Sequence, residues 1–295
     1  MFAAVAQCFG AFFTKSHPLK RYRDRLVGHE GISTLDPSLL PTAHNDRRLI
    51  FIGDVHGCLE ELEHLIRKVG FNPRNDHLIF VGDLVAKGPF SLETIDFIDD
   101  LSHSASCVRG NHDDKLLQWH AYLTERSKDT DLEEERLPDG LSRRDEHRLL
   151  AKNLTQLETG YLESLPYILL IPKSGSCLKR NYLVCHAGLL ANVPLAKQKC
   201  WDVNNMRNVT RHGHAIDDRE EGEGWFLAWE KAQSHLPSHE QVTVVYGHDA
   251  GRGLNIRHTT RGLDSRCVRG GQLTAMVVDA HGEHFVQVEA KKRYD

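Results

Sequence analysis

The sequence predicts an α/β fold, on the basis of three observations. Short apolar runs alternate with helix-forming segments along the first half of the chain. Most of these runs are continuously apolar, which is typical of strands that are buried on both faces. Each run also ends in a polar motif. In folds built from such units, ligand-binding groups gather at the carboxyl ends of the strands.

The first half of the chain is predicted to form strand, helix, strand, helix and strand in turn. The runs RRLIFI and HLIFV each stop at a glycine and an acid, in GDVHG and GDLVAKGP. Between them, Leu59, Leu62 and Leu65 fall on one face of a helix that Gly70 can cap at its C-terminus. SLETIDFIDDL predicts the second helix, and the run before GNHD predicts the third strand. Two later strands, in NYLVCHAGL and VTVVYGHDA, each end in a histidine motif.

The composition is that of a folded protein with a sizeable core. The chain has 295 residues, 40% of them hydrophobic, and a formal net charge of -4. This charge lacks the basic excess of proteins that bind nucleic acid non-specifically, so we expect no DNA partner. The seven cysteines form no CxxC pair, and we interpret them as free, mostly buried thiols. We therefore expect a cytoplasmic protein, with a vacuolar or membrane-associated location as the alternative.

Residues 1–46 are interpreted as an N-terminal extension of a domain at 47–290. MFAAVAQCFGAFF is apolar but too short to span a bilayer, and no basic residue precedes it as in a signal peptide. The preferred interpretation is a terminal helix packed on the body, or a frayed end. The alternative is membrane contact, with the phenylalanines in the interface and KSHPLKRYRDR beside lipid headgroups.

A charged segment at 116–165 is inserted in this domain. Its pattern is helical, with Pro138 and Gly140 interrupting it, so we expect a solvated pair of helices. Charges of both signs argue against a nucleic-acid surface. The alternative is a cap over the active site that contributes Arg143 or Arg144 to substrate binding.

The polar motifs after the five apolar runs predict a metal site. Carboxylate, imidazole and amide groups form a mixed donor set that suits Mn, Fe or Zn better than a thiolate site would. A central carboxylate such as Asp83 can bridge two cations, which together activate a water molecule and neutralise a phosphoryl group. Each motif is weak alone, whereas five that alternate strictly with strands are a strong signal. The candidate metal ligands are Asp54, His56, Asp83, Asn111, His186 and His248.

This series of motifs resembles the signature of the phosphoprotein-phosphatase superfamily of calcineurin-like metallophosphoesterases, over about residues 48 to 280. The resemblance implies a β-sandwich flanked by helices (α/β/β/α) and two divalent metal ions, chosen among Mn, Fe, Zn, Co and Mg. It also implies in-line attack of a metal-bridging hydroxide, with His112 as the general acid. By motif position, the first metal is held by Asp54, His56 and Asp83, and the second by Asp83, Asn111, His186 and His248.

Two residues of GDLVAKGP depart from the Ser/Thr protein phosphatases of this superfamily, whose turn carries an aspartate and an arginine. Ala86 cannot orient His112 through a hydrogen bond, so another group, which the sequence does not identify, must do so. Lys87 supplies a point charge in place of a planar clamp on phosphate. The turn resembles that of bacterial diadenosine tetraphosphatases and, in its lysine, that of their eukaryotic relatives, the ApaH-like phosphatases.

Further motifs are similar to those of the ApaH-like phosphatases. NNMRN and GLDSRCVRGGQLTA match patterns of that group, although Ser265 and Arg266 stand where Thr-Gly is usual. By this resemblance an arginine of NNMRN binds phosphate. The candidate catalytic residues are His112, Lys87 and Arg207, of which Lys87 and Arg207 also bind substrate, and the candidate supporting residues behind the ligands are Arg109 and Asp113.

The predicted activity is hydrolysis of a phosphoanhydride bond in inorganic polyphosphate, a dinucleoside polyphosphate or capped RNA. A phosphate or nucleotide leaving group needs less help from an oriented acid than a serine alkoxide does, which is consistent with Ala86. One alternative is a protein Ser/Thr phosphatase, and another is a catalytically silent phosphate-binding module. Tyr161, Trp201, Trp225 and Trp229 could stack on a nucleobase, although the spacing of EGWFLAW is typical of a core helix.

Overall fold

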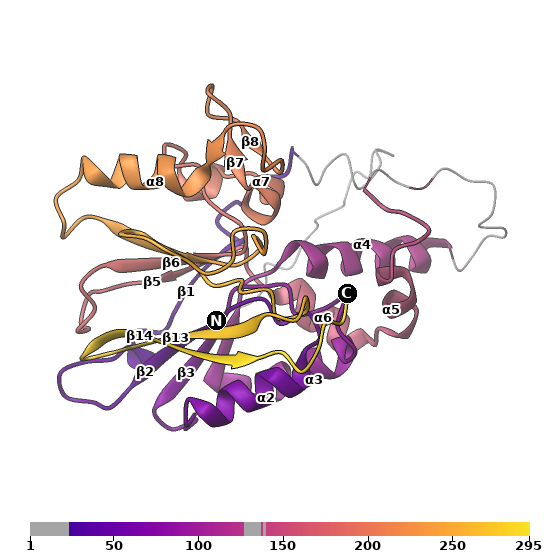
Figure 1. Cartoon of the computed structure of the whole chain (residues 1–295), viewed down its shortest axis with the longest axis horizontal. Coiled ribbons are helices and arrows are strands. Elements are labelled where there is room, and N and C mark those ends of the chain that lie inside the picture. The colour runs from indigo at the N-terminus through magenta and orange to yellow at the C-terminus, as the bar shows by residue number, and fades with distance from the viewer. Residues whose placement is uncertain (1–23, 127–136, 138–139) are drawn as a thin grey trace, which may run out of the picture.

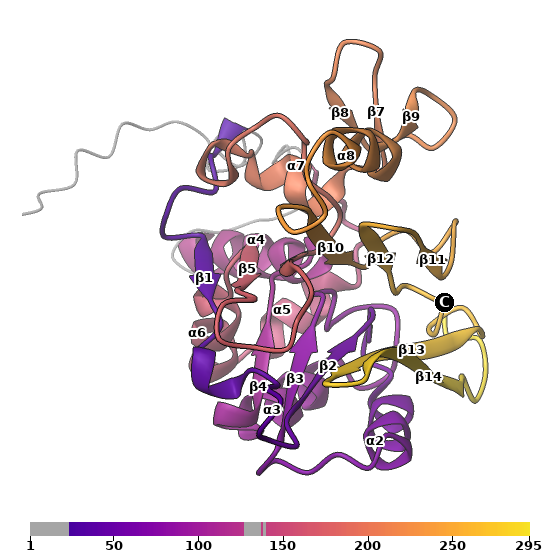
Figure 2. The ribbon, with the colours of Figure 1, turned by 90° about the vertical axis from the view of Figure 1, so that its left-hand side faces the viewer.

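The computed structural model describes residues 24–126, 137 and 140–295, and a sandwich of two β-sheets forms its centre (Figures 1 and 2). One sheet has six strands in the order β1-β5-β6-β10-β12-β11, and the other has five in the order β14-β13-β2-β3-β4. Helices α2 and α3 cover the outer face of the five-stranded sheet, and α7 and α8 cover that of the six-stranded sheet (Figure 1). The predicted α/β/β/α layering is therefore confirmed.

The bounds of the strands and helices are as follows. The strands are β1 Ile32–Thr34, β2 Arg48–Ile52, β3 Asp76–Phe80, β4 Ala105–Cys107, β5 Ile168–Ile171, β6 Asn181–Cys185, β7 Asn208–Val209, β8 Ala215–Ile216, β9 Glu223–Gly224, β10 Val242–Tyr246, β11 Asn255–Ile256, β12 Thr260–Gly262, β13 Gln272–Asp279 and β14 Gly282–Glu289. The α-helices are α2 Leu59–Lys68, α3 Ser91–Asp100, α4 Asn111–Arg126, α5 His147–Asn153, α6 Gln156–Ser164, α7 Cys200–Asn205 and α8 Trp225–Ser234.

The alternation of strands and helices predicted for the first half is confirmed. β2, α2, β3, α3 and β4 follow one another, and the three strands pair in parallel. Leu62 and Leu65 of α2 are buried against the sheet, and Gly70 just beyond the helix has a φ of 62°, which suits the predicted cap. Because parallel strands point the same way, the loops that follow them meet at one edge of the sheet.

Alternate side chains of each central strand enter different apolar layers. In β2, Ile50 and Ile52 face the layer beneath the helices, while Leu49 and Phe51 face the layer between the two sheets. A third layer lies between the six-stranded sheet and α8, and it contains Trp225. The continuously apolar runs of the sequence are therefore strands buried on both faces.

The charged segment at 116–165 differs from the expected solvated pair of helices. It forms most of α4 together with α5 and α6, and α4 begins earlier, at Asn111. Leu116 and Trp119 are buried in the core because one face of α4 packs on the body, which the many charges of the segment concealed. Arg143 and Arg144 are exposed and do not line the pocket described below, so their expected role in a cap is not supported.

The described part of the predicted N-terminal extension contributes to the sheet. Strand β1 pairs in parallel with β5, in the register Ile32 with Ile168. The expectations for the apolar N-terminus fall on residues 1–23, which lie outside the described residues. Within the described residues, no helix has the length and apolar character needed to cross a bilayer.

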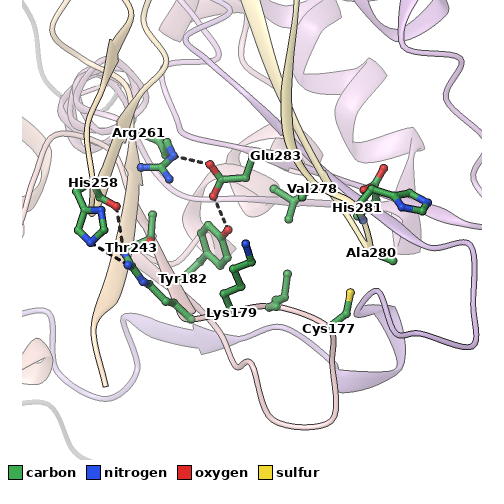
Figure 3. A pocket seen from close by; sticks show the side chains of 14 residues that line it. Cys177, Lys179, Tyr182, Thr243, His258, Arg261, Val278, Ala280, His281 and Glu283 are labelled. Carbon is green, nitrogen blue, oxygen red and sulfur yellow. Dashed lines mark hydrogen bonds and ion pairs between the residues drawn. The ribbon is translucent and has the colours of Figure 1, made fainter. Parts of the chain in front are cut away.

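The described cysteines are free thiols, and five of these six are buried, as the sequence predicted. One of them, Cys177, lines a cavity of about 330 Å³ at the edge where β6 and β10 begin and β13 turns into β14 (Figure 3). The charged groups there largely bind one another, since Glu283 accepts hydrogen bonds from Tyr182 and Arg261 at 2.6 and 2.7 Å. This edge is opposite to the one where the predicted ligands lie.

Gly160 lies exposed in α6, and no other group lies within 4 Å of the position that a Cβ atom would take there. Gly160→Ala should therefore stabilise the protein by about 0.5–1 kcal/mol, because alanine loses less backbone entropy than glycine in a helix. Chemical denaturation would measure the change. An unchanged or lower free energy of unfolding would contradict this account of the helix.

Candidate metal and phosphate site

The six residues predicted as metal ligands come together at the edge of the sandwich where strands of both sheets end. Loops of the five-stranded sheet supply four of them, and loops of the six-stranded sheet supply two. They are Asp54 and His56 after β2, Asp83 after β3, Asn111 at the start of α4 after β4, His186 after β6 and His248 after β10.

Asp83 lies at the centre of this group, with one carboxylate oxygen toward each half of it. Its Oδ2 is 3.5 Å from Nε2 of His56, and its Oδ1 is 3.3 Å from Nε2 of His186. Oδ2 of Asp54 lies 4.0 Å from the same His56 nitrogen. A carboxylate whose two oxygens face separate sets of donor atoms has the geometry to bridge two cations.

Asn111 turns its amide oxygen toward two imidazole rings. Its Oδ1 is 3.0 Å from Nε2 of His186 and 2.9 Å from Nδ1 of His248. The other ring nitrogens face carbonyl oxygens, of Val81 at 2.9 Å and of Asn205 at 3.0 Å respectively. A nitrogen that faces a carbonyl carries the proton, so the inner nitrogen of each neutral ring is left with a lone pair for a metal.

His56 is oriented in the same way. Its Nδ1 is 3.0 Å from the carbonyl of Val85, so Nε2 presents the lone pair toward the cluster. The ammonium group of Lys87 lies 2.9 Å from this Nε2 and places a positive charge where a cation would bind. A metal ion at this nitrogen would displace the ammonium group of Lys87 from the lone pair of His56.

The electrostatics of the cluster favour added positive charge. Burial alone would raise the pKa of Asp83, but the neighbouring His186 and His112 hold it well below its usual range. Burial and the nearby acid Asp264 raise the pKa of Asp54. Burial would lower the pKa of His186, yet Asp83 raises it to about 9. In the absence of a metal, a proton on His186 neutralises part of the negative charge of the two carboxylates. A divalent cation could take over this role, and the nitrogen and oxygen donors of the cluster fit a metal centre.

The backbone at the ligands is held in an uncommon conformation. His56, Asp83 and His248 have φ values of 48°, 52° and 68°. Such residues cost of order 1–3 kcal/mol each and persist only where the surroundings fix them. Gly247 allows one of these fixing contacts, since a Cβ there would lie 1.8 Å from Oδ1 of Asp54. With glycine in place, Asp54 accepts the backbone N–H of His248 at 3.0 Å.

The two predicted supporting residues lie behind the ligands. Asp113 accepts the backbone N–H groups of Asp83 at 3.0 Å and of Gly110 at 2.8 Å, so it ties two ligand loops together. Burial raises the pKa of Asp113 to about 7. Arg109 is 3.4 Å from Asp114, and its guanidinium also donates to the carbonyl of Glu163 at the end of α6.

The imidazole of His112 lies edge to edge with that of His147, a residue that sequence analysis did not single out. Nδ1 of His112 is 2.9 Å from Nε2 of His147, and the ring centroids are 5.0 Å apart. The backbone N–H of His112 donates to Oδ1 of Asp83 at 2.9 Å. His147 belongs to no motif and lies 35 residues along the chain, so only the fold brings the two rings together.

Basic side chains line the pocket around the ligands. Lys87 and Arg207 were predicted there, and the structure places both in its lining. Sequence analysis did not assign three more arginines to the site. Arg266 and Arg269 lie in the motif GLDSRCVRGGQLTA, which gave them no role, and Arg219 lies in a loop without a motif. The complete set is Lys87, Arg207, Arg219, Arg266 and Arg269.

Asp249 of the GHDA motif anchors several of these cations. Arg219 donates through Nε to its Oδ1 at 2.8 Å, and Nε of Arg207 lies 4.0 Å from the same oxygen. Arg252 pairs with the other carboxylate oxygen. Burial and the charge of Arg219 lower the pKa of Arg207, as expected where cations are crowded.

Arg266 is held over the pocket by an uncommon backbone conformation. Its φ is 67°, in the left-handed region that favours glycine. Its guanidinium donates to the carbonyl oxygens of Ala250 and Gly251. The arginine thus occupies the position where the ApaH-like pattern has glycine, and it adds a positive charge beside the last ligand loop.

The fold and this site together are those of a metal-dependent phosphoesterase. Residues 47–278 match the calcineurin-like phosphoesterase family, and the chain belongs to this family of hydrolases, which use a divalent metal centre. The family predicted from the motifs is therefore confirmed.

Relatives of this chain act on phosphoanhydrides, as their names state. It is 29% identical over 275 residues to the zinc-dependent endopolyphosphatase of Saccharomyces cerevisiae, covering 82% of each chain. It is 27% identical over 299 residues to the symmetrical bis(5'-nucleosyl)-tetraphosphatase of Aromatoleum aromaticum, covering 82% of this chain and 97% of the relative. A crystal structure provisionally assigned as a diadenosine tetraphosphatase superposes with a TM-score of 0.66 at 32% identity, over 88% of this chain and 97% of that one.

Asp83→Asn should lower the bound metal and reduce hydrolysis by at least about 100-fold, because the variant loses the negative charge between the two sets of donors. Elemental analysis after dialysis measures the metal, and phosphate release measures turnover. Asp202→Asn is the matched control, since Asp202 is a half-buried acid of α7 outside the pocket lining. Equal metal content in wild type and Asp83→Asn would contradict the central place of Asp83.

Proposed function

We propose that this protein hydrolyses phosphoanhydride bonds in substrates with several consecutive phosphates, with inorganic polyphosphate as the preferred class and dinucleoside polyphosphates second. The observation that carries this proposal is the lining of the pocket. It contains five basic side chains and, among the described residues, no Trp, Tyr or Phe on which a nucleobase could stack.

The size of the pocket agrees with recognition through phosphate. It encloses about 60 Å³. Sites for drug-sized molecules enclose roughly 300–1,000 Å³, so a phosphoryl group can enter while the rest of the substrate stays outside. The arginines at the rim are placed to meet the phosphates that follow the one being cleaved.

We infer that two divalent cations bind in this site. Asp54, His56 and Asp83 would hold one, and Asp83, Asn111, His186 and His248 the other. The bound cations would supply charge neutralisation at the phosphoryl oxygens and a nucleophile from water at neutral pH. The zinc dependence named for the yeast relative and the mixed nitrogen and oxygen donors make zinc a good candidate.

The roles proposed for the chain's own residues follow from position and charge. Lys87 and Arg207 bind the phosphoryl group from two sides of the ligand cluster. His112 protonates the leaving oxygen, because its ring lies next to His56, with centroids 4.9 Å apart, and one ring nitrogen lies within 4.8 Å of a carboxylate oxygen of Asp83. Asp113 and Arg109 hold the ligand loops in place through hydrogen bonds on the side of the loops away from the pocket.

The protein Ser/Thr phosphatase alternative is less well supported. Trp225 and Trp229 lie in the core, as their helical spacing indicated. The small basic pocket is lined by few apolar side chains, Ala250 and Val268, on which a peptide could pack. A silent phosphate-binding module would have no need of a complete set of ligands. Capped RNA remains a third substrate for the assay, and the free thiols favour a reducing compartment such as the cytoplasm.

The test is a substrate panel for the purified protein with Mn, Co, Zn or Mg. It contains long-chain polyphosphate, diadenosine tetraphosphate, capped RNA and a phosphopeptide. We expect the highest kcat/KM for polyphosphate. Fast cleavage of the phosphopeptide without cleavage of any anhydride would overturn the proposal, and so would the absence of turnover by the folded, metal-loaded protein.

Arg266→Gly should raise the KM for polyphosphate about tenfold or more while kcat changes little, because it removes one charge-assisted phosphate contact. Glycine suits the left-handed backbone at this position, so the variant should fold. Arg67→Ala is the control, since Arg67 is exposed, lies outside the pocket lining and pairs across the surface with Glu63 at 3.6 Å. A KM equal to that of the control would show that Arg266 does not bind substrate.

A further inference from the structure

Three consecutive residues of the inserted segment, Asp145 to His147, connect α4 with the site. Asp145 accepts hydrogen bonds from Lys115 at 2.8 Å and from the indole of Trp119 at 3.1 Å, which fixes the start of α5 on α4. Glu146 and His147 follow directly and reach the predicted catalytic groups. We call these three residues the DEH triplet.

Glu146 holds the turn that carries Lys87. Its Oε1 accepts the backbone N–H of Lys87 at 2.8 Å. Ala86 and Lys87 have φ values of 74° and 72°. These values lie in the left-handed region, which is unfavourable for residues other than glycine, so the turn is strained at two successive positions. The neighbouring N–H of Ala86 donates to the hydroxyl of Ser91 at 2.9 Å. Both contacts stabilise a backbone that is otherwise unfavourable for these residues.

His147 is placed to orient His112. Its side chain is buried, and its Nε2 lies 2.9 Å from Nδ1 of His112. The two rings are 24° from parallel, as suits a hydrogen bond that lies close to both ring planes, and this bond restricts rotation of the catalytic ring. Ala86 has only a methyl group and can make no such bond.

We propose that His147 is the positioning residue for His112, in place of the carboxylate that position 86 lacks. This inference rests on the hydrolytic function proposed above. In its acid form His112 carries a proton on both ring nitrogens. Nε2 of His147 accepts a hydrogen bond from Nδ1–H of His112, which keeps the second proton, on Nε2 of His112, directed at the substrate. As the bond from phosphorus to the leaving oxygen breaks, that oxygen takes this proton. The oxygen of water forms the new bond to phosphorus, and a proton from water restores His112.

This assignment places the proton of His147 on Nδ1. That atom is buried and has no hydrogen-bond partner among the described residues. A buried N–H without a partner costs of order 1–3 kcal/mol, and such costs are tolerated at functional sites. The bonds of Asp145 to Lys115 and Trp119 hold the start of α5 in place and so help to keep the ring of His147 beside His112.

The experiment compares His147→Ala, His147→Gln and a matched control, His120→Ala, in the metal-loaded protein. His120 also links α4 to α5, through a bond of 3.2 Å to the carbonyl of Ala151, but it does not line the pocket. The substrates are aryl phosphates that differ only in the leaving group, from phenol to 2,4-dinitrophenol. A poor leaving group depends on the general acid and a good one does not.

We expect His147→Ala to lower kcat for phenyl phosphate about 10- to 100-fold, to change KM and metal content little, and to leave dinitrophenyl phosphate nearly unaffected. His147→Gln should recover much of the loss, since its amide can reach the place of Nε2. A uniform loss across the leaving groups, a loss shared with His120→Ala, or a lower metal content would each overturn the proposal.

An NMR experiment tests the positioning role of His147 independently of which substrate the protein cleaves. In zinc-loaded protein labelled with nitrogen-15, the Nδ1–H of His112 should give a slowly exchanging signal because it is hydrogen-bonded to His147, and His147→Ala should broaden or remove that signal. An unchanged signal would overturn the positioning role whether or not the protein cleaves polyphosphate. Aryl phosphate cleavage without polyphosphate cleavage would refute only the substrate.

Discussion

The buried carboxylate of Asp83 is the constraint on which the rest of the site depends. A negative charge away from water is costly unless other groups surround it with positive charge and hydrogen bonds. Here His56 and His186 face its two oxygens, and the first turn of α4 donates a backbone N–H to it. The side chain of Asp113 accepts a hydrogen bond from the backbone N–H of Asp83. Strand ends, a helix terminus and a supporting acid are thus all arranged around one side chain.

The parts of this arrangement that follow strands could be predicted from the sequence. The apolar runs mark buried strands, and a glycine with an acid, amide or histidine at the end of each run marks where the chain leaves the sheet. Because parallel strands end at one edge, Asp54, Asp83 and Asn111 were expected to meet, and they do. His186 and His248 were also expected at the carboxyl ends of strands, whereas their position on a second sheet followed only from the resemblance of the motifs to a known family.

The parts that belong to loops and to the charged segment could not be predicted. His147 and Glu146 lie in a stretch whose charges suggested solvent, and nothing in the local pattern shows that α4 and α5 fold back over the site. Asp249 and Arg219 are 30 residues apart, and their pairing depends on how two irregular loops pass each other. Such contacts are set by tertiary packing, which leaves no periodic trace in the chain.

The division of the candidate ligands between the two sheets has a mechanical consequence. Asp54, Asp83 and Asn111 extend from the five-stranded sheet, whereas His186 and His248 extend from the six-stranded one. An ion bound by ligands from both sheets would hold the two sheets together at this edge, while the apolar layer between them holds them together in the interior. The affinity for the ion and the free energy of unfolding would then be linked, because separation of the two sheets would require loss of the ion. A chelator would therefore lower the stability of the whole sandwich as well as stop turnover.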